Sequence, residues 1–246
     1  MFELGTTDHW WPSAKKYPLL SNHQNTLKPM GYAHVAALLE QFNSQKVLEV
    51  GHGAGSLLFD IFKEGKEFWG LDDVVEDSLV KDNDLDWMKE EYPSVKFVKG
   101  LLGNNVKELP DDYFDMVCSV SVIEHIPIDV LNRSFEETYR ILKPGGIVCH
   151  SYDIYYGQNT KPVFDAFENA GFKWLKPKET MNVFWEEWLG VYSKETITKI
   201  IQKIIFENPM FVAEIYMWQT ERSLREPQIN WMSVLTAAQK PIIQSN

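Results

Sequence analysis

Short apolar runs alternate along the chain with segments in which apolar residues recur every three or four positions. The apolar runs predict five strands, at 46–50, 67–71, 95–99, 116–120 and 146–150. Between these runs, and from Val35 to Phe42 before the first, apolar residues follow the period of a helix. Strands that alternate with helices form a parallel sheet with helices on both faces. The pattern therefore predicts a doubly wound α/β fold.

Further elements are predicted at both ends of the chain. Residues 6–29 are aromatic and irregular in pattern, and we expect no regular element there. Pro162 and Gly171 bracket a helix, after which 172–176 predicts a sixth strand. An isoleucine stripe at 197–205 predicts a packed helix, and 211–218 predicts a seventh strand.

The turn after the first strand combines a carboxylate with glycines. Glu49 precedes Gly51, Gly53 and Gly55, which permit positive φ and close approach of a ligand to the backbone. The spacing differs from the dinucleotide pattern G-x-G-x-x-G/A, whose third glycine is Ser56 here. A carboxylate before the loop repels a pyrophosphate. It suits a ligand that carries ammonium and sulfonium groups, as S-adenosylmethionine does.

The second strand also ends in a carboxylate, Asp72, 23 positions after Glu49. An acid in this place can accept hydrogen bonds from both ribose hydroxyls of a nucleoside. It can equally cap the helix that follows. Taken together with Glu49 and the glycines, Asp72 favours the nucleoside interpretation.

Two later blocks carry a family resemblance. Residues 109–126 read LPDDYFDMVCSVSVIEHI, and residues 140–148 read RILKPGGIV. With the glycine turn and Asp72, the chain from about 46 to 172 resembles the class I S-adenosylmethionine-dependent methyltransferases, especially their small-molecule branch. The resemblance implies a Rossmann-like, doubly wound, seven-stranded sheet that is mostly parallel. Its last strand, here 211–218, would run antiparallel between the fifth and sixth.

The resemblance also divides the chain and assigns a donor site. Residues 1–43 would form an aromatic lid segment with a helix, and 44–246 a methyltransferase domain with a long insertion near 177–210. S-adenosylmethionine would be bound, and S-adenosylhomocysteine released, by Glu49, Gly51, His52, Gly53, Gly55, Asp72, Asp73, Leu101, Leu102, Ser119 and Val120. The family often has an aspartate where this chain has Leu101. Asn104 or Asn105 could supply the adenine contact instead, or both could be turn residues.

The acceptor side is predicted from the chemistry of methyl transfer. An acceptor hydroxyl must lose its proton during attack, and histidine is the commonest base for that task. His125 and His150 are the catalytic candidates, since they follow the fourth strand and end the fifth, where an open α/β sheet has its crevice. Each could instead be a hydrogen-bonding residue without a catalytic role. Tyr152 and Asp153, in the next loop, suit acceptor contacts.

The N-terminal aromatic residues are the other substrate-binding candidates. Trp10, Trp11 and Tyr17 could wall a pocket for a small acceptor. They could also cover the edge of the core or contact a second copy of the chain. We expect a monomer or a homodimer.

The composition of the chain limits the classes of molecule that it is expected to bind. Lysine plus arginine number 24 against 35 aspartate plus glutamate, a net charge of −11, which disfavours nucleic acid as a substrate. No run is long enough for a membrane span, and the first residues lack a signal-peptide pattern. A cytoplasmic enzyme is therefore expected, with Cys118 and Cys149 as buried thiols. No Cys/His spacing predicts a metal site.

The sequence leaves several functions open. Methyl transfer to a hydroxyl oxygen of a small molecule is preferred. The alternatives are N-methylation of a small amine and a non-catalytic, methyltransferase-like binding subunit. Aminopropyl transfer is less favoured, because paired aspartates are absent after the fourth strand, at 119–122.

Overall fold

The computed structural model describes residues 1–5, 7–21, 28–53, 55–62, 64–73, 84–155, 160–177 and 231–242. Its strands are β1 (Phe2–Leu4), β2 (Lys46–Val50), β3 (Glu67–Asp72), β4 (Lys96–Lys99), β5 (Phe114–Val120), β6 (Leu142–Tyr155), β7 (Lys173–Trp174) and β8 (Trp231–Gln239). Its helices are α1 (Thr7–Lys16), α2 (Lys28–Gln41), α3 (Leu57–Phe62), α4 (Asp84–Glu91), α5 (Ile128–Ile141) and α6 (Lys161–Asn169), with short 3-10 turns η1 (Pro18–Ser21) and η2 (Ile123–His125).

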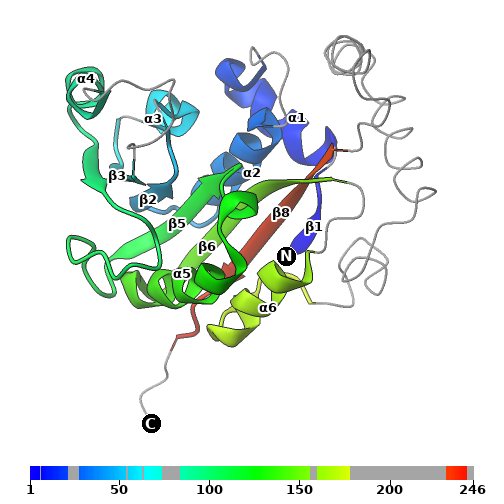
Figure 1. The fold of residues 1–246 in the computed structure, drawn as a ribbon. Helices are drawn as coiled ribbons and strands as arrows, with labels where there is room; N and C mark the ends of the chain where they lie inside the picture. Colours follow the sequence, from blue (N-terminus) through cyan, green and yellow to red (C-terminus); the bar gives the residue numbers. More distant parts are fainter. Residues whose placement is uncertain are drawn as a thin grey trace, which may run out of the picture.

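The strands form one mixed sheet with the order β1-β8-β6-β5-β2-β3-β4 (Figure 1). Strands β2 to β6 are parallel to their neighbours, and β8 runs antiparallel to β6. The other edge of β8 pairs with β1 and β7 at different points along its length. The predicted doubly wound, mostly parallel sheet is confirmed, with β1 as an additional strand.

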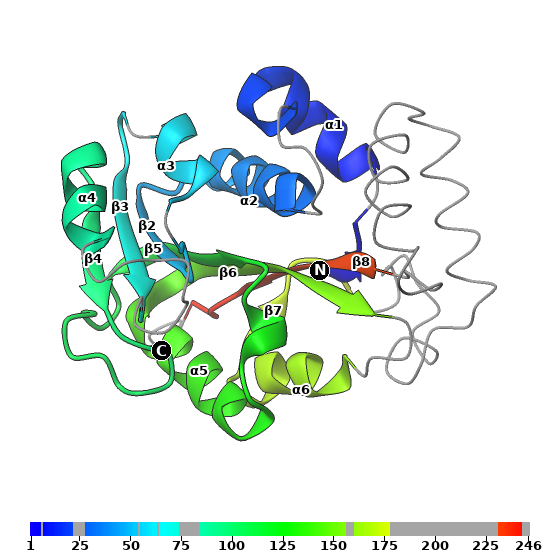
Figure 2. The same ribbon diagram turned by 45° about the horizontal axis from the view of Figure 1, so that its top comes forward.

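Helices cover both faces of the sheet. Figure 2 shows the sheet nearly edge-on, with α1, α2 and α3 on one side and α5 and α6 on the other. Successive residues of a strand point to opposite faces, so Val47 packs with the first group of helices and Leu48 with the second. The apolar runs found in the sequence are therefore buried on both faces, as in other parallel sheets.

The last strand of the sheet is not the one predicted. Residues 211–218 lie outside the described part of the chain. The antiparallel position between β6 and β7 is held by β8, Trp231–Gln239, so the place assigned to 211–218 was wrong. The isoleucine stripe at 197–205 and most of the predicted insertion near 177–210 also lie outside the described residues.

The prediction that residues 6–29 lack a regular element was also wrong, since α1 forms there. This helix packs on α2, where the Ser13 hydroxyl donates to the carbonyl of Ala33 at 2.9 Å. Ala14 is buried in the same contact region. Packing against another helix stabilises α1, and the local sequence pattern does not indicate that contact.

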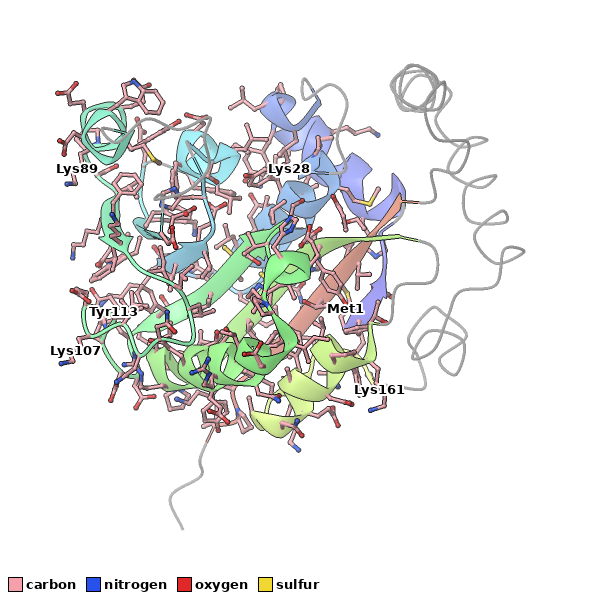
Figure 3. All side chains as sticks on the ribbon, viewed as in Figure 1. Met1, Lys28, Lys89, Lys107, Tyr113 and Lys161 are labelled. Atoms are coloured by element: carbon pink, nitrogen blue, oxygen red, sulfur yellow. The ribbon has the colours of Figure 1, made fainter. Side chains whose placement is uncertain are left out.

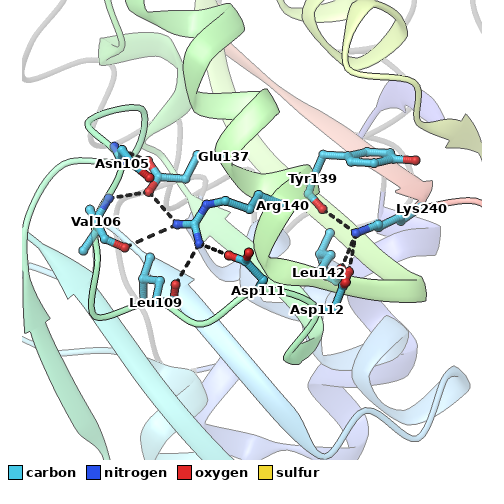
Figure 4. Close-up of polar contacts among 10 residues, drawn as sticks. All are labelled: Asn105, Val106, Leu109, Asp111, Asp112, Glu137, Tyr139, Arg140, Leu142 and Lys240. Atoms are coloured by element: carbon cyan, nitrogen blue, oxygen red, sulfur yellow. Dashed lines mark hydrogen bonds and ion pairs between the residues drawn. The ribbon is translucent and has the colours of Figure 1, made fainter.

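The loop after β4 is held by a charged side chain of α5 (Figure 4). The Glu137 carboxylate accepts backbone N–H groups from Gly103 and Val106, both at 2.5 Å, and from Asn105 at 3.2 Å. Arg140 Nη2 donates to the same carboxylate at 3.1 Å. One buried side chain thus satisfies three backbone donors and fixes the loop against the sheet.

The described residues bear on two further expectations. Cys118 and Cys149 are neighbours in register on β5 and β6, and both are buried free thiols, as predicted. No helix in the described ranges combines the length and apolar character of a membrane span.

Replacing Glu137 by alanine tests the importance of this loop contact. The variant leaves three backbone donors without their acceptor and removes one of the acceptors of Arg140, so we expect a loss of about 3 kcal/mol in the free energy of unfolding. Denaturant titration of the wild type and the variant measures it. Glu136→Ala, an exposed neighbour on the same helix, is the control and should change stability by less than about 0.5 kcal/mol. Equal losses in the two variants would contradict the assignment.

Candidate active site

The candidate site lies at the carboxyl ends of the parallel strands. All three predicted glycines have positive φ, +71° at Gly51, +58° at Gly53 and +147° at Gly55. The loop is tied to the next strand, since Gly51 N donates to the Leu71 carbonyl at 2.8 Å. Gly53 N donates to Asp72 Oδ2, also at 2.8 Å. The glycine turn and the acid that ends β3 therefore form one unit.

The glycine turn is tightly packed at Gly51 and has free space at Gly53. A Cβ at Gly51 would lie 2.4 Å from Val122 Cγ2, so this glycine lets the turn pack on the segment after β5. A Cβ at Gly53 would meet no described atom within 4 Å. The turn is thus closed toward β5 and open at Gly53.

Glu49 is a buried carboxyl beneath this turn, with 1% of its surface exposed. Burial raises the pKa of Glu49 to about 8, against a hydrogen bond from Ser56 and the charge of Lys28, which lower it. Its Oε2 atom has no hydrogen-bond partner among the described residues. The Ser56 hydroxyl also accepts Leu58 N at 3.1 Å, at the start of α3. Lys28 is the first residue of α2 (Figure 3).

His52 has its ring inside the core. The ring contacts Phe59 and Phe97 at centroid distances of 5.9 and 5.3 Å. It also lies against Gly70, where a Cβ would come within 2.6 Å of it. Burial lowers the pKa of His52. The neutral ring supports the glycine turn from the side of α3.

The predicted adenine segment follows β4. Leu101 is exposed by 52% at the strand end, whereas Leu102 is buried in the core beside α5. Asn104 and Asn105 are exposed, and Asn105 has a positive φ of 54°. Their backbone conformation fits turn residues. Leu101 offers an apolar surface on the same side of the sheet as the end of β3, and Asp73 there is half-buried.

His150 is part of the core, contrary to the prediction that it ends the fifth strand. The strand β6 continues to Tyr155 because β8 pairs with it as far as Trp231. The ring of His150 contacts Phe135 at 5.5 Å, and its Nδ1 is 2.8 Å from Ser119 Oγ. Burial lowers its pKa to about 3. His150 and the Ser119 hydroxyl are thus bonded to each other inside the core, and this placement does not favour His150 as a base.

A group of polar residues lies where β5 and β6 end. Glu124 Oε1, on η2, accepts the backbone N–H of Asp153 at 3.3 Å. The Tyr152 side chain is 1% exposed, and its hydroxyl has no partner among the residues the structure describes. His125, the other predicted base, has a side chain that is 79% exposed on the same turn. Val120 faces α2, since a Cβ at Gly31 would lie 2.8 Å from its Cγ1.

The comparisons with known proteins bear on this arrangement. A family model described as a methyltransferase domain matches residues 48–150, which include the glycine turn, Asp72, the end of β5 and the first part of β6. The chain is also similar to a ubiquinone biosynthesis O-methyltransferase of Klebsiella pneumoniae, with 23% identity over 223 residues, 89% of this chain and 76% of that protein.

The matched domain and the relatives support a class I S-adenosylmethionine-dependent methyltransferase.

Two further matches are a sequence relative and a solved structure that shares the fold. A sterol 4-C-methyltransferase of Caenorhabditis elegans is 20% identical over 216 residues, covering 83% of this chain and 62% of that protein. The structure of a phosphoethanolamine N-methyltransferase from Haemonchus contortus shares the fold, with a TM-score of 0.53 and 20% identity. That match covers 92% of this methyltransferase and 56% of the other chain. The relatives named here act on oxygen, carbon and nitrogen.

The residues of this methyltransferase fit S-adenosylmethionine. The fit rests on the buried Glu49 oxygen that has no partner in the described ranges, which suits a cationic group. It also rests on the open side of the turn at Gly53 and on the position of Asp72 beside it. Sequence reasoning missed Ser56 and Lys28. Serine and lysine carry no spacing signal, and only the packing of α2 and α3 on the sheet brings them to Glu49.

The N-terminal candidates of the methyltransferase are distributed along α1. Trp10 and Trp11 are in the first half of the helix, and their side chains lie outside the described part of the structure. Tyr17 follows the helix, donates to Glu40 near the end of α2 and packs on Phe62 at 5.2 Å. Because α2 leads from its first residue at the crevice to the amino end of β2, Tyr17 lies at the opposite end of the sheet. Its observed contacts are with α2 and α3, and the substrate contact of Tyr17 stays a prediction.

Gly51→Ala tests the turn in this methyltransferase. The new Cβ combines a left-handed backbone with a clash against Val122, so we expect about 2 kcal/mol or more of destabilisation. Gly65→Ala is the matched control, since Gly65 also has positive φ, +83°, but no atom within 4 Å of a Cβ. Calorimetric titration with S-adenosylhomocysteine should show an affinity reduced about tenfold or more only in Gly51→Ala. A similar loss in Gly65→Ala would mean that global strain, rather than the turn, controls binding.

Proposed function

We propose that this methyltransferase transfers a methyl group from S-adenosylmethionine to a hydroxyl oxygen of a small-molecule acceptor. The observation that carries the donor part is the buried carboxyl of Glu49, whose Oε2 has no partner within the described residues, directly beneath the glycine turn. A buried carboxylate requires a cationic or hydrogen-bonding partner to be stable. A bound ligand with a positive charge supplies one.

The donor is held by three strand ends. Glu49 binds the methionine end, and Asp72 accepts hydrogen bonds from the ribose while its Oδ2 keeps Gly53 N in place. Leu101 packs on the adenine. Backbone groups at Gly51, Gly53 and Gly55 approach the ligand closely because no Cβ intervenes. The side chain of His52 supports the glycine turn from beneath.

The acceptor part rests on the relatives and on the crevice. When bound, S-adenosylmethionine supplies a methyl group on a positively charged sulfur, so the protein mainly has to orient the acceptor and manage its proton. The relative from Klebsiella pneumoniae, most of whose length this chain spans, is named for transfer to oxygen. The ends of β5 and β6 provide polar side chains for a small acceptor at this place, Glu124 and Asp153 among them.

N-methylation of a small amine is the second candidate. The observation that favours it is the same group of carboxyls at the ends of β5 and β6, which would also bind an ammonium group. A non-catalytic binding subunit is the third interpretation. It predicts binding of the donor or of a partner without turnover of any acceptor.

Asp72→Ala tests the donor site. Removing the carboxylate deletes both the ribose contacts and the acceptor for Gly53 N, so affinity for S-adenosylhomocysteine should fall about 10- to 100-fold. Isothermal titration calorimetry measures it directly. Asp86→Ala, an exposed change on α4, should leave the affinity unaltered. Wild-type protein that binds neither S-adenosylmethionine nor S-adenosylhomocysteine would refute the proposed function.

Glu49 predicts a pH dependence of donor binding. Its pKa of about 8 in the free protein means that the carboxyl is mostly protonated at pH 7. A positively charged donor favours the ionised form, lowers this pKa and so releases a proton on binding. Affinity should therefore rise between pH 6 and 8. Titration calorimetry in buffers of different ionisation enthalpy counts the proton, and Glu49→Gln should abolish the part contributed by the carboxyl. An unchanged proton count in Glu49→Gln would contradict the assignment.

A further inference from the structure

The turn that follows β5 lies next to the carboxyl of Asp153. Ser121 follows the strand with a φ of +55°, a left-handed conformation that is uncommon for serine and is often found at functional sites. Ser121 N donates to the Ser151 carbonyl at 2.8 Å, which fixes this turn against β6. Ser121 lies close enough to the carboxyl of Asp153 to lower its pKa. The turn therefore brings Ser121 beside Asp153, which is two residues past Ser151.

A second carboxyl adjoins the first. Glu124 Oε1 accepts Asp153 N, whereas Glu124 Oε2 is buried and has no hydrogen-bond partner among the described residues. The side chain of Glu124 is only 8% exposed. The buried hydroxyl of Tyr152 also has no partner in the described ranges. Buried polar atoms are costly without partners, so these atoms indicate a ligand with polar groups of its own.

The surroundings of Asp153 shift the pKa of its carboxyl toward neutral pH. Burial and, to a smaller extent, the neighbouring charge of Glu124 raise the pKa of Asp153 to about 7. Lys28 from α2, Ser121 after β5 and His125 from η2 act in the opposite direction. Opposite Asp153 on β8 is the uncharged Ser233. Burial raises the pKa of Glu124 as well, so the titrations of the two neighbouring carboxyls are coupled.

We propose that Asp153 is the catalytic residue that accepts the proton of an acceptor hydroxyl during methyl transfer, with Glu124 as the residue that positions and tunes it. This inference rests on the proposed function. The O–H bond breaks and its proton goes to the Asp153 carboxylate. The oxygen lone pair forms the new C–O bond, while the electron pair of the carbon–sulfur bond returns to sulfur and leaves a neutral thioether.

The carboxyl pair fills the place that the histidines were predicted to hold. His150 is enclosed between α5, α6 and the sheet, and it is hydrogen-bonded to Ser119. Asp153 instead lies at the strand end, beyond the last register pair of β5 with β6 at Val120 and Ser151. A base that titrates near the working pH is the most effective one, and a carboxyl reaches that range only when its ionised form is disfavoured.

The deciding experiment is a pH titration of the Asp153 carboxyl by carbon NMR in aspartate-labelled protein, with the signal assigned from Asp153→Asn. We expect Asp153 to titrate near pH 7. In Glu124→Gln the loss of the neighbouring charge should lower its pKa, yet leave it above the ordinary value because burial remains. Titration at an ordinary aspartate pKa in wild-type protein overturns the proposal, as does a midpoint that Glu124→Gln leaves unchanged.

Methyl transfer to small phenols gives a second readout that a merely structural role would not change. Asp153→Asn should lower transfer to catechol about 10²–10⁴-fold. It should lower transfer to the more acidic 4-nitrocatechol much less, because that phenol ionises without a base. Asp129→Asn, an exposed change on α5, should leave both rates and their pH profiles unaltered.

Two controls separate this inference from the proposed function. Asp153→Asn should bind S-adenosylhomocysteine with wild-type affinity and melt as wild type does. Equal loss for both phenols, or an equal loss of transfer to ethanolamine, would assign Asp153 to acceptor binding and overturn its role as base. Failure of the wild-type protein to bind S-adenosylhomocysteine would instead refute the proposed function.

Discussion

The site depends on the backbone pairing of β6 with a different strand on each edge. Parallel pairing with β5 ends at Ser151, whereas antiparallel pairing with β8 continues to Tyr155. The part of β6 that extends past β5 carries Tyr152 and Asp153 to the carboxyl edge of the sheet. Without β8 these residues would belong to a loop, and nothing would fix them opposite Glu124.

Desolvation then determines the chemistry of that edge. Glu49 on β2, Glu124 on η2 and Asp153 on β6 come from three separate segments, and burial raises the pKa of each. Lys28, at the first turn of α2, acts on all three in the opposite direction. Among the described residues Lys28 faces all three carboxyls, and each carboxyl that ionises adds negative charge to the crevice. Such a crevice is suited to a positively charged donor and to a base that titrates close to neutrality.

Much of the fold could be predicted from local pattern. The strands at β2, β3, β4 and β5 were found within a few residues of their observed bounds. The signal is clearest for β2 and β5, because strands buried on both faces are mostly apolar. The misplaced elements depend on distant partners instead. Helix α1 is stabilised by α2, β1 exists only through its pairing with β8, and β8 itself took the place expected for 211–218. Pairing between residues far apart in the chain leaves no periodic signal.

The sequence by itself determined the donor turn. Gly51, Gly53 and Gly55 predict a backbone with positive φ, which the structure has, and the carboxylate before them is the basis for proposing a cationic ligand. The tertiary structure alone decided the acceptor side. It placed His150 in the core, Tyr17 at the far end of the sheet, and Asp153 beside Glu124. The physical reason is that side-chain direction alternates along a strand and the pKa follows burial, and both are set by neighbours that the local sequence does not specify.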